Sequence, residues 1–163
     1  FVGAALGSIA PDIDQPTAHI WSDIPIIGRI LGKATSLALG GHRNLSHSLL
    51  GLTFFSFLAY WVIGHFPIKE IVVSQIAFIS FEVGFIFHLL ADSTTVMGIP
   101  LFWPFGGYVG FPPHPFQGAR IETGKWFENL VVYPGVWIYL LWFIHSHTGK
   151  LIEILKLATK NGA

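Results

Sequence analysis

The chain has 163 residues, of which 52% are hydrophobic and only 11% are charged, less than half of the roughly 25% charged residues typical of soluble domains. Nine basic and nine acidic residues give a formal net charge of zero, which argues against a nucleic-acid partner held by basic charge. The chain has no cysteine, so disulfides, thiolate nucleophiles and cysteine-type zinc sites are excluded. The apolar residues come in long blocks, which indicates an integral membrane protein.

Four apolar segments follow one another along the chain. Residues 1–10 are too short to cross a bilayer, and we expect them to be the last half of a helix that begins upstream. Residues 46–64, 71–92 and 126–145 each approach the roughly 20 residues that a spanning helix needs. The sequence therefore predicts an all-α polytopic membrane bundle of about four to five helices. We expect one membrane-embedded domain over residues 1–163, with an incomplete N-terminal helix.

Loops rich in proline and glycine separate these segments: PDIDQP, HFPIKE, and MGIPLFWPFGGYVGFPPHPFQG over residues 97–118. The third loop cannot form a regular helix or a central strand. It carries Phe102, Trp103, Phe105 and Tyr108, and aromatic side chains are favoured at headgroup depth. We predict a re-entrant or interfacial loop.

Counting membrane crossings brings three polar motifs to one membrane surface. If the first helix ends at Asp12 and Asp14, the chain stays on that side until the second helix begins after His42 and His47. That helix crosses away and the next one returns, so the HLLAD motif at residues 88–92 ends on the first side again.

Each motif has an ordinary explanation as well as a functional one. His88 and Asp92 are four residues apart and share one helix face, where they can bind a metal or simply form a buried pair. Asp12 and Asp14 oppose the dipole of the helix that they follow, although they can cap the next element. Two such close carboxylates repel each other unless a cation or a proton intervenes.

The stretch GHRNLSHS lies directly before the second apolar segment. Ser46 is a candidate N-cap, but capping does not explain His42 and His47. Histidine beside a spanning segment is costly and usually functional, and neutral imidazole is a common metal ligand. Arg43 suits a phosphate or a carboxylate, or it extends toward the lipid headgroups.

Together the motifs predict a metal centre on one membrane face. Its predicted ligands are Asp12, Asp14, His42, His47, His88 and Asp92. Histidine and aspartate without cysteine suit one or two divalent ions, with zinc favoured and manganese or iron as alternatives. Glu128, in the first turn of the last spanning segment, is a candidate catalytic base or an ordinary helix-start carboxylate.

These motifs resemble those of the YdjM-type family of LexA-binding, inner-membrane-associated proteins, which are described as metal-dependent hydrolases. Beside the predicted ligands, the matching residues include Pro11, Gly41, Arg43, Ser48, Thr95, Gly98, Pro100, Leu101, Trp103 and Pro104. The chain departs from the family pattern at Ser46, where threonine is usual, and at Ala10, where leucine is common. The stretch TGKWFENL also resembles a later family segment, which favours a role for Glu128. The resemblance implies a Thr-His pair upstream that would add a further ligand.

We expect a metal-dependent hydrolase in the inner membrane of a prokaryote, acting at the membrane interface on a phospholipid or a lipid-linked phosphate ester. Arg43 would neutralise the substrate anion and Glu128 or an aspartate would accept the proton. The expected partners are membrane lipids and a lipid-like substrate. Two alternatives remain: a non-catalytic binding or regulatory protein with a structural metal site, and an ion or metal transporter. Only Glu82 lies at mid-membrane depth, which counts against transport.

Overall fold

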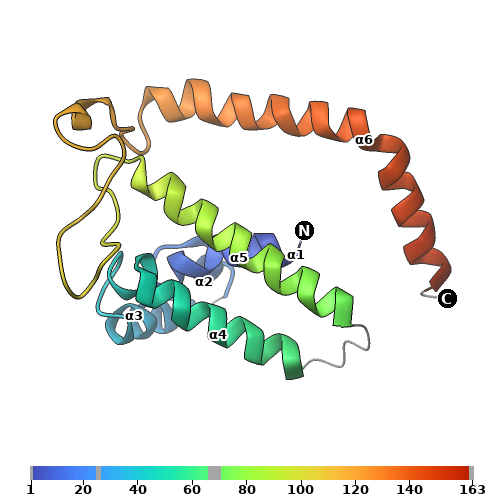
Figure 1. Cartoon of the computed structure of the whole chain (residues 1–163), viewed down its shortest axis with the longest axis horizontal. Coiled ribbons are helices and arrows are strands. Elements are labelled where there is room, and N and C mark those ends of the chain that lie inside the picture. Colours follow the sequence, from blue (N-terminus) through green and yellow to red (C-terminus); the bar gives the residue numbers. More distant parts are fainter. Residues whose placement is uncertain (1, 25–26, 66–70, 162–163) are drawn as a thin grey trace. The chain divides into compact units, whose positions relative to one another are not determined.

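The computed structural model describes residues 2–24, 27–65 and 71–161, and the regular secondary structure of these residues is helical. Its α-helices are α1 (Val2–Ile9), α2 (His19–Ser22), α3 (Gly28–Ala38), α4 (Leu49–His65), α5 (Ile71–Ser93) and α6 (Tyr133–Asn161) (Figure 1). The described part contains no β-strand, and its only β-type pairing is an isolated antiparallel bridge between Ile99 and Val109. The prediction of an all-α protein is confirmed.

The chain forms two compact units, residues 1–120 and residues 121–163. The first unit contains α1 to α5 and the aromatic loop, and the second contains a π-helical turn (Glu128–Val132) followed by α6. The expected single domain over residues 1–163 stays a prediction.

Two helices are long and apolar enough to cross a membrane: Val73–Ser93, and Glu128–Lys150 through the π-helical turn into α6. The predicted segment 46–64 forms the shorter α4, whose 17 residues are apolar, and α1 has 8 residues. The described residues thus support two spans, and the finer prediction of four to five spans goes beyond them. In the predicted HFPIKE turn, the five residues that follow His65 lie outside the described residues.

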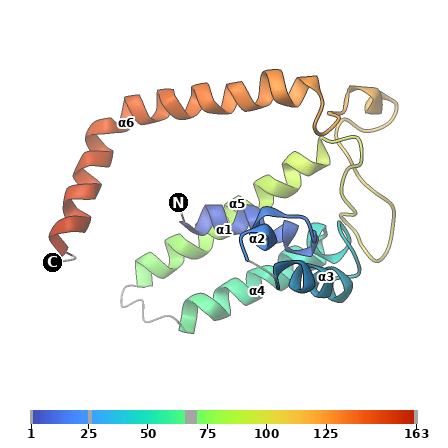
Figure 2. The ribbon, with the colours of Figure 1, turned by 180° about the vertical axis from the view of Figure 1, so that it is seen from behind.

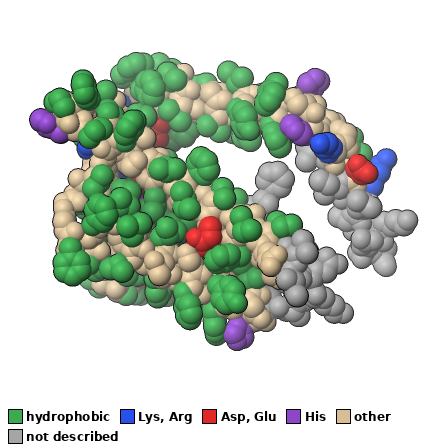
Figure 3. Space-filling model, viewed as in Figure 1, with side chains coloured by type: hydrophobic (Ala, Val, Ile, Leu, Met, Phe, Trp, Pro, Cys, Tyr) green, Lys and Arg blue, Asp and Glu red, His purple; other side chains and the backbone are tan. Residues whose placement is uncertain are grey.

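Exposed apolar side chains cover the first unit. Phe57 and Tyr60 on α4 are 70% and 67% exposed, and Phe87 on α5 is 67% exposed. On the face drawn in Figure 3, hydrophobic side chains dominate and charged side chains are few. Such a surface is costly in water but suits the hydrocarbon of a bilayer, where apolar side chains face outward.

Glycine allows α1 to pack directly on the backbone of α5 (Figure 2). A Cβ atom at Gly7 would lie 2.0 Å from the carbonyl oxygen of Phe81, and one at Gly84 would lie 2.1 Å from that of Ala4. Gly3 and Gly7 are four residues apart on α1 and face α5 together. This is the small-residue pattern that lets membrane helices approach closely.

The segment between Asp14 and His42 contains two short helices, α2 and α3. These helices hold the turn that follows α1, a 3₁₀ segment at Ala10–Asp14. The Trp21 indole N–H donates to the carbonyl oxygen of Ile13 (3.1 Å). The Thr35 hydroxyl lies 2.8 Å from the same carbonyl. The residue between Asp12 and Asp14 is therefore fixed from outside the turn.

Packing beneath the turn is apolar. The buried core of the first unit consists of Phe55, Phe85, Leu89 and Ile99, with Ala10, Ile13, Leu39, Leu52, Phe81 and Leu101 packed around it. The core lies between α4 and α5 and reaches the turn that follows α1 and the base of the aromatic loop. It thereby holds together the three segments that carry the predicted metal ligands.

Candidate metal centre

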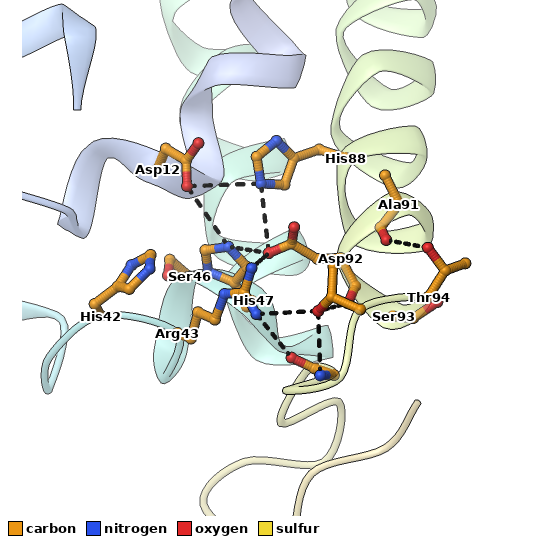
Figure 4. Close-up of polar contacts among 12 residues, drawn as sticks. Asp12, His42, Arg43, Ser46, His47, His88, Ala91, Asp92, Ser93 and Thr94 are labelled. Atoms are coloured by element: carbon orange, nitrogen blue, oxygen red, sulfur yellow. Dashed lines mark hydrogen bonds and ion pairs between the residues drawn. The ribbon is translucent and has the colours of Figure 1, made fainter. Parts of the chain in front are cut away.

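Four of the six predicted ligands, Asp12, His47, His88 and Asp92, meet in one cluster where α4 begins and α5 ends (Figure 4). Asp12 Oδ1 lies 3.9 Å from His47 Nε2 and 3.7 Å from His88 Nε2. Asp92 Oδ2 lies 3.2 Å from His47 Nε2 and 3.9 Å from His88 Nε2. Asp12, His47 and His88 form a group whose ligand atoms all lie within 4.8 Å of one another.

Both imidazoles present an unsatisfied nitrogen to the cluster. His47 Nε2 and His88 Nε2 are buried and, among the described residues, have no hydrogen-bond partner. Buried polar atoms are rarely left without a partner in folded proteins. Two such atoms converging on the same carboxylates form a site that could hold a cation.

The outer nitrogens of the two rings fix their tautomers. His88 Nδ1 lies 2.7 Å from the carbonyl oxygen of Ser8, which can only accept, so the proton is on Nδ1. His47 Nδ1 lies 2.8 Å from Ser46 Oγ, and the Ser46 hydroxyl donates its one proton to Asp14. His47 Nδ1 is therefore a donor too. In the neutral rings both Nε2 lone pairs face the cluster, as metal ligation requires.

Asp14 and His42 are not part of this group of four residues, and Asp14 is linked to it through Ser46. Asp14 is fully buried, and its carboxylate accepts from the His42 ring (2.8 Å), the backbone N–H of Arg43 (3.0 Å) and the Ser46 hydroxyl. Its oxygens are thus already engaged by the protein. This geometry favours a supporting role for Asp14 and His42, whereas the metal-ligand role assigned to them from sequence stays a prediction.

The environment of Asp14 keeps it ionised. Burial alone would raise the pKa of this carboxyl group, but hydrogen bonds from His42 and Ser46, together with the charges of His47 and His42, outweigh burial. The pKa of Asp14 therefore lies below its ordinary value of 3.8. An ionised Asp14 strengthens the hydrogen bond that Ser46 donates to it, and through Ser46 it orients His47.

Arg43 connects the two sides of the cluster. Its guanidinium Nη2 lies 2.7 Å from Asp92 Oδ2, and Nη1 lies 3.3 Å from the carbonyl oxygen of Gly98. Arg43 has a φ of 60°, in the left-handed region that few non-glycine residues adopt. Its backbone N–H points at Asp14 in this conformation. Arg43 Nε is buried without a hydrogen-bond partner among the described residues.

Charge at the cluster favours a divalent cation. Asp12, Asp14 and Asp92 bring three carboxylates to the cluster and its surroundings, whereas Arg43 brings the one guanidinium that contacts them among the described residues, so carboxylates are in excess by two. Uncompensated buried charge is costly. One divalent ion balances this excess, and the donor set of imidazole and carboxylate without sulfur suits zinc, manganese or iron.

Glu128 belongs to the second unit, so its place relative to the cluster is not described. Its carboxylate accepts from the backbone N–H of Gly124 and lies 3.3 Å from the Tyr133 hydroxyl. Both contacts are local and stabilise the start of the last helical segment. A catalytic role for Glu128 stays a prediction.

Sequence reasoning underestimated one serine and misplaced a helix cap. Ser46 is fully buried and links Asp14 to His47; its position beside a predicted ligand was the available signal. The N-cap of α4 is Ser48, whose Oγ accepts from the backbone N–H of Gly51 (3.1 Å). Assigning the cap to Ser46 was wrong because a 3₁₀ turn (Leu45–His47) precedes α4, so the helix begins at Leu49 and its cap lies two residues after Ser46.

The helical fold, the apolar surface and the buried His/Asp cluster define a membrane protein with a candidate metal centre. Comparison with known sequences gives the family. The family described as "YdjM inner membrane protein" matches residues 1–155, and the chain belongs to it. The chain is accordingly an inner membrane protein.

Individual relatives agree with this membership. "Inner membrane protein YdjM" of Escherichia coli (strain K12) is 31% identical over 148 residues, which cover 88% of this chain and 65% of the relative; the Shigella flexneri protein of the same name gives the same values. "Uncharacterized protein YvsG" of Bacillus subtilis (strain 168) is 29% identical over 128 residues, 78% of this chain and 68% of that protein. The chain thus spans slightly less than two thirds of the YdjM proteins. No solved structure matches.

Proposed function

We propose that this chain is a metal-dependent hydrolase that acts at the membrane–water boundary on a phospholipid or a lipid-linked phosphate ester. The observation that carries the proposal is the convergence of two buried, unpartnered imidazole nitrogens, of His47 and His88, with carboxylate oxygens of Asp12 and Asp92. Ligand atoms about 2.0–2.1 Å from one tetrahedral ion lie roughly 3.4 Å apart. The observed 3.2–3.9 Å separations fit one such ion after small shifts.

Asp12, His47 and His88 would hold the ion, with Asp92 as a fourth ligand. Zinc is favoured, and manganese or iron would suit the same donors. When bound, the ion would supply Lewis-acid polarisation of the ester and would lower the pKa of a water molecule toward neutrality.

The chain's own groups have separable tasks in this proposal. Asp12 is 42% exposed and can accept a proton from water that enters from the surface. The Arg43 guanidinium holds Asp92 in place, and its positive charge would neutralise an anionic group of the substrate. Asp14 and Ser46 keep the His47 ring in its ligating orientation.

Accessibility favours catalysis over a purely structural ion. Structural sites are coordinatively closed, whereas catalytic sites keep a position open to substrate. His47 is fully buried, but Asp12 on the opposite side of the group is substantially exposed. This contrast supports a site that is anchored from beneath and open on one side.

The aromatic loop supports a location at the membrane interface. Residues 93–119 contain no Lys, Arg, Asp or Glu, and Phe105 and Phe111 are 83% and 66% exposed. The base of the loop is joined to both helices beside the site: the Leu49 N–H donates to Leu101 O (3.0 Å) and the Phe111 N–H to Ser93 O (2.7 Å). Exposed aromatics at this level fit the headgroup region.

Metal content of detergent-purified protein tests the proposal first. We expect near-stoichiometric zinc, manganese or iron by elemental analysis, and its loss in His47→Ala and His88→Ala. His65→Ala is the matched control, since among the described residues the recorded polar and ring contacts of His65 are with Trp61 of its own helix. Wild-type protein that is folded but takes up no supplied metal would refute the metal centre. Metal without metal-dependent hydrolysis of lipid phosphate esters would refute catalysis alone.

A further inference from the structure

The His42 ring is held from one side by a buried carboxylate. Its Nδ1 lies 2.8 Å from Asp14 Oδ1, and Asp14 is fully buried. An ionised carboxylate only accepts hydrogen bonds, so in the neutral ring the proton is on Nδ1 and the lone pair is on Nε2. A carboxylate behind an imidazole fixes the tautomer and the orientation of the ring in the same way in hydrolases that use histidine to move a proton.

The second nitrogen of His42 remains free. Among the described residues, Nε2 has no hydrogen-bond partner, and the His42 side chain is 32% exposed. The Nε2 atoms of His47 and His88 are instead buried and close to the carboxylates of the cluster. His42 is also outside the group whose ligand atoms lie within 4.8 Å of one another. Its lone pair is therefore available when that group holds an ion.

The His42 ring is near enough to the cluster to act on a molecule bound there. The centroids of the His42 and His47 rings are 5.5 Å apart, and the rings meet edge to face at 85°. His47 also contacts His88, with centroids 5.4 Å apart. Figure 4 shows His42 at the edge of the cluster, beside Ser46. A base can act directly or through one water molecule, and a gap of this size has room for such a molecule.

We propose that His42 is the catalytic base of the candidate hydrolase rather than a metal ligand, with Asp14 as its positioning residue. The inference rests on the proposed function and deepens it, because it assigns the proton transfers to one side chain. His42 Nε2 takes a proton from the attacking water as the water oxygen bonds to phosphorus. The P–O bond to the leaving alcohol breaks with its electron pair on oxygen, and Nε2 returns the proton to that oxygen.

His42 suits this task better than Asp12. Asp12 is exposed enough to accept a proton, but its Oδ1 lies 3.9 Å from His47 Nε2 and 3.7 Å from His88 Nε2. Its carboxylate would share its charge with a bound ion and so hold a proton less well. The charge of Asp14, in contrast, compensates the positive charge that develops on the His42 ring when Nε2 takes the proton.

Asp14→Asn tests the tautomer in metal-free protein. The Arg43 backbone N–H and the Ser46 hydroxyl both donate to Asp14 Oδ2, so the oxygen of an introduced amide has to take that position. The amide NH₂ then faces His42 Nδ1 and makes that nitrogen an acceptor, which moves the ring proton to Nε2. Nitrogen-15 NMR of histidine-labelled protein should show a protonated Nδ1 in wild type and a protonated Nε2 in Asp14→Asn. Asp23→Asn, at an exposed aspartate, is the control and should match wild type.

Chemical modification tests whether His42 Nε2 stays free in the loaded protein. Diethylpyrocarbonate acylates accessible imidazole nitrogens that carry a lone pair, and mass spectrometry locates the product. We expect His42 to react equally with and without supplied zinc, whereas zinc blocks any reaction at His47 and His88. Asp14→Asn should react more slowly at His42 but not at His65, an exposed internal reference. Protection of His42 by zinc would identify it as a ligand and overturn the inference.

Hydrolysis and metal content together separate this inference from the proposed function. His42→Ala is expected to keep the zinc content of wild type and to lose about 10²–10⁴-fold in kcat on lipid phosphate esters, whereas His65→Ala changes neither. Zinc loss from His42→Ala, or an unchanged kcat, would overturn the inference and leave the proposed function standing. A wild type without metal and hydrolysis would overturn the proposed function itself. If Asp14→Asn does not fold, His42→Ala and the modification of wild type decide the matter.

Discussion

Replacement of Ser46 by alanine separates a metal centre from a general polar network. The Ser46 hydroxyl accepts from His47 Nδ1 (2.8 Å) and donates to Asp14. In Ser46→Ala, Asp14 keeps its other two donors, but the His47 N–H loses its acceptor inside a fully buried site. An unsatisfied buried donor costs about 1–3 kcal/mol. Loss of such an outer partner typically weakens metal binding about 10–100-fold.

The two magnitudes are consistent, because a 10–100-fold loss of affinity corresponds to about 1.4–2.8 kcal/mol. Zinc affinity is measured in detergent by competition with a chelator of known affinity, and thermal unfolding of the metal-free protein is followed in parallel. Ser146→Ala is the control, since the Ser146 hydroxyl donates to Trp142 O on its own helix and, within the described part of the chain, to no residue of the cluster. A zinc affinity in Ser46→Ala equal to that of wild type would refute the argued role of the outer hydrogen bond.

Two further predictions concern packing and pH. Gly7→Ala places a methyl group 2.0 Å from the carbonyl oxygen of Phe81, so we expect destabilisation of about 1–3 kcal/mol in thermal unfolding, whereas Gly64→Ala, with open space around it, should be nearly neutral; equal effects would contradict the close helix contact. Because the pKa of Asp14 is lowered from 3.8 on folding, its stabilisation is present above about pH 4 and is lost as pH falls further. The difference in melting temperature between wild type and Asp14→Asn, measured without metal, should therefore shrink below that pH, and a constant difference would contradict the prediction.

Hydrophobic blocks were sufficient to predict the helical class and the position of α5. Residues 71–92 were predicted and Ile71–Ser93 was found, because long apolar runs without proline leave few alternatives to a helix. The last segment was predicted to end at residue 145, but α6 continues to Asn161. Its later residues are more polar, and a helix continues beyond an apolar span when no residue terminates it.

The sequence spacing did not show that Asp14 and His42 lie outside the cluster, whereas the other four predicted ligands form it. Counting membrane crossings requires only the number of helices between two motifs. The count therefore correctly brought Asp12, His47 and His88 to the same end of the bundle. Asp12 and Asp14 lie two residues apart in the 3₁₀ helix Ala10–Asp14, which has about three residues per turn. Their side chains therefore point about 120° apart, one toward the cluster and the other beneath the turn. That conformation depends on the contacts of Ile13 with α2 and α3, which the sequence pattern did not reveal.

The close glycine contact between α1 and α5 also determines when the centre can exist during biosynthesis. Asp12 and His47 are synthesised well before His88 and Asp92, and the last two arrive only with the end of α5. Until α5 has entered the membrane and docked on α1, no partial set of these residues offers more than one imidazole and one carboxylate. Under the proposed function, tight capture of an ion would thus be coupled to the completion of folding, and the metal content of a purified sample would count the molecules in which α5 has docked.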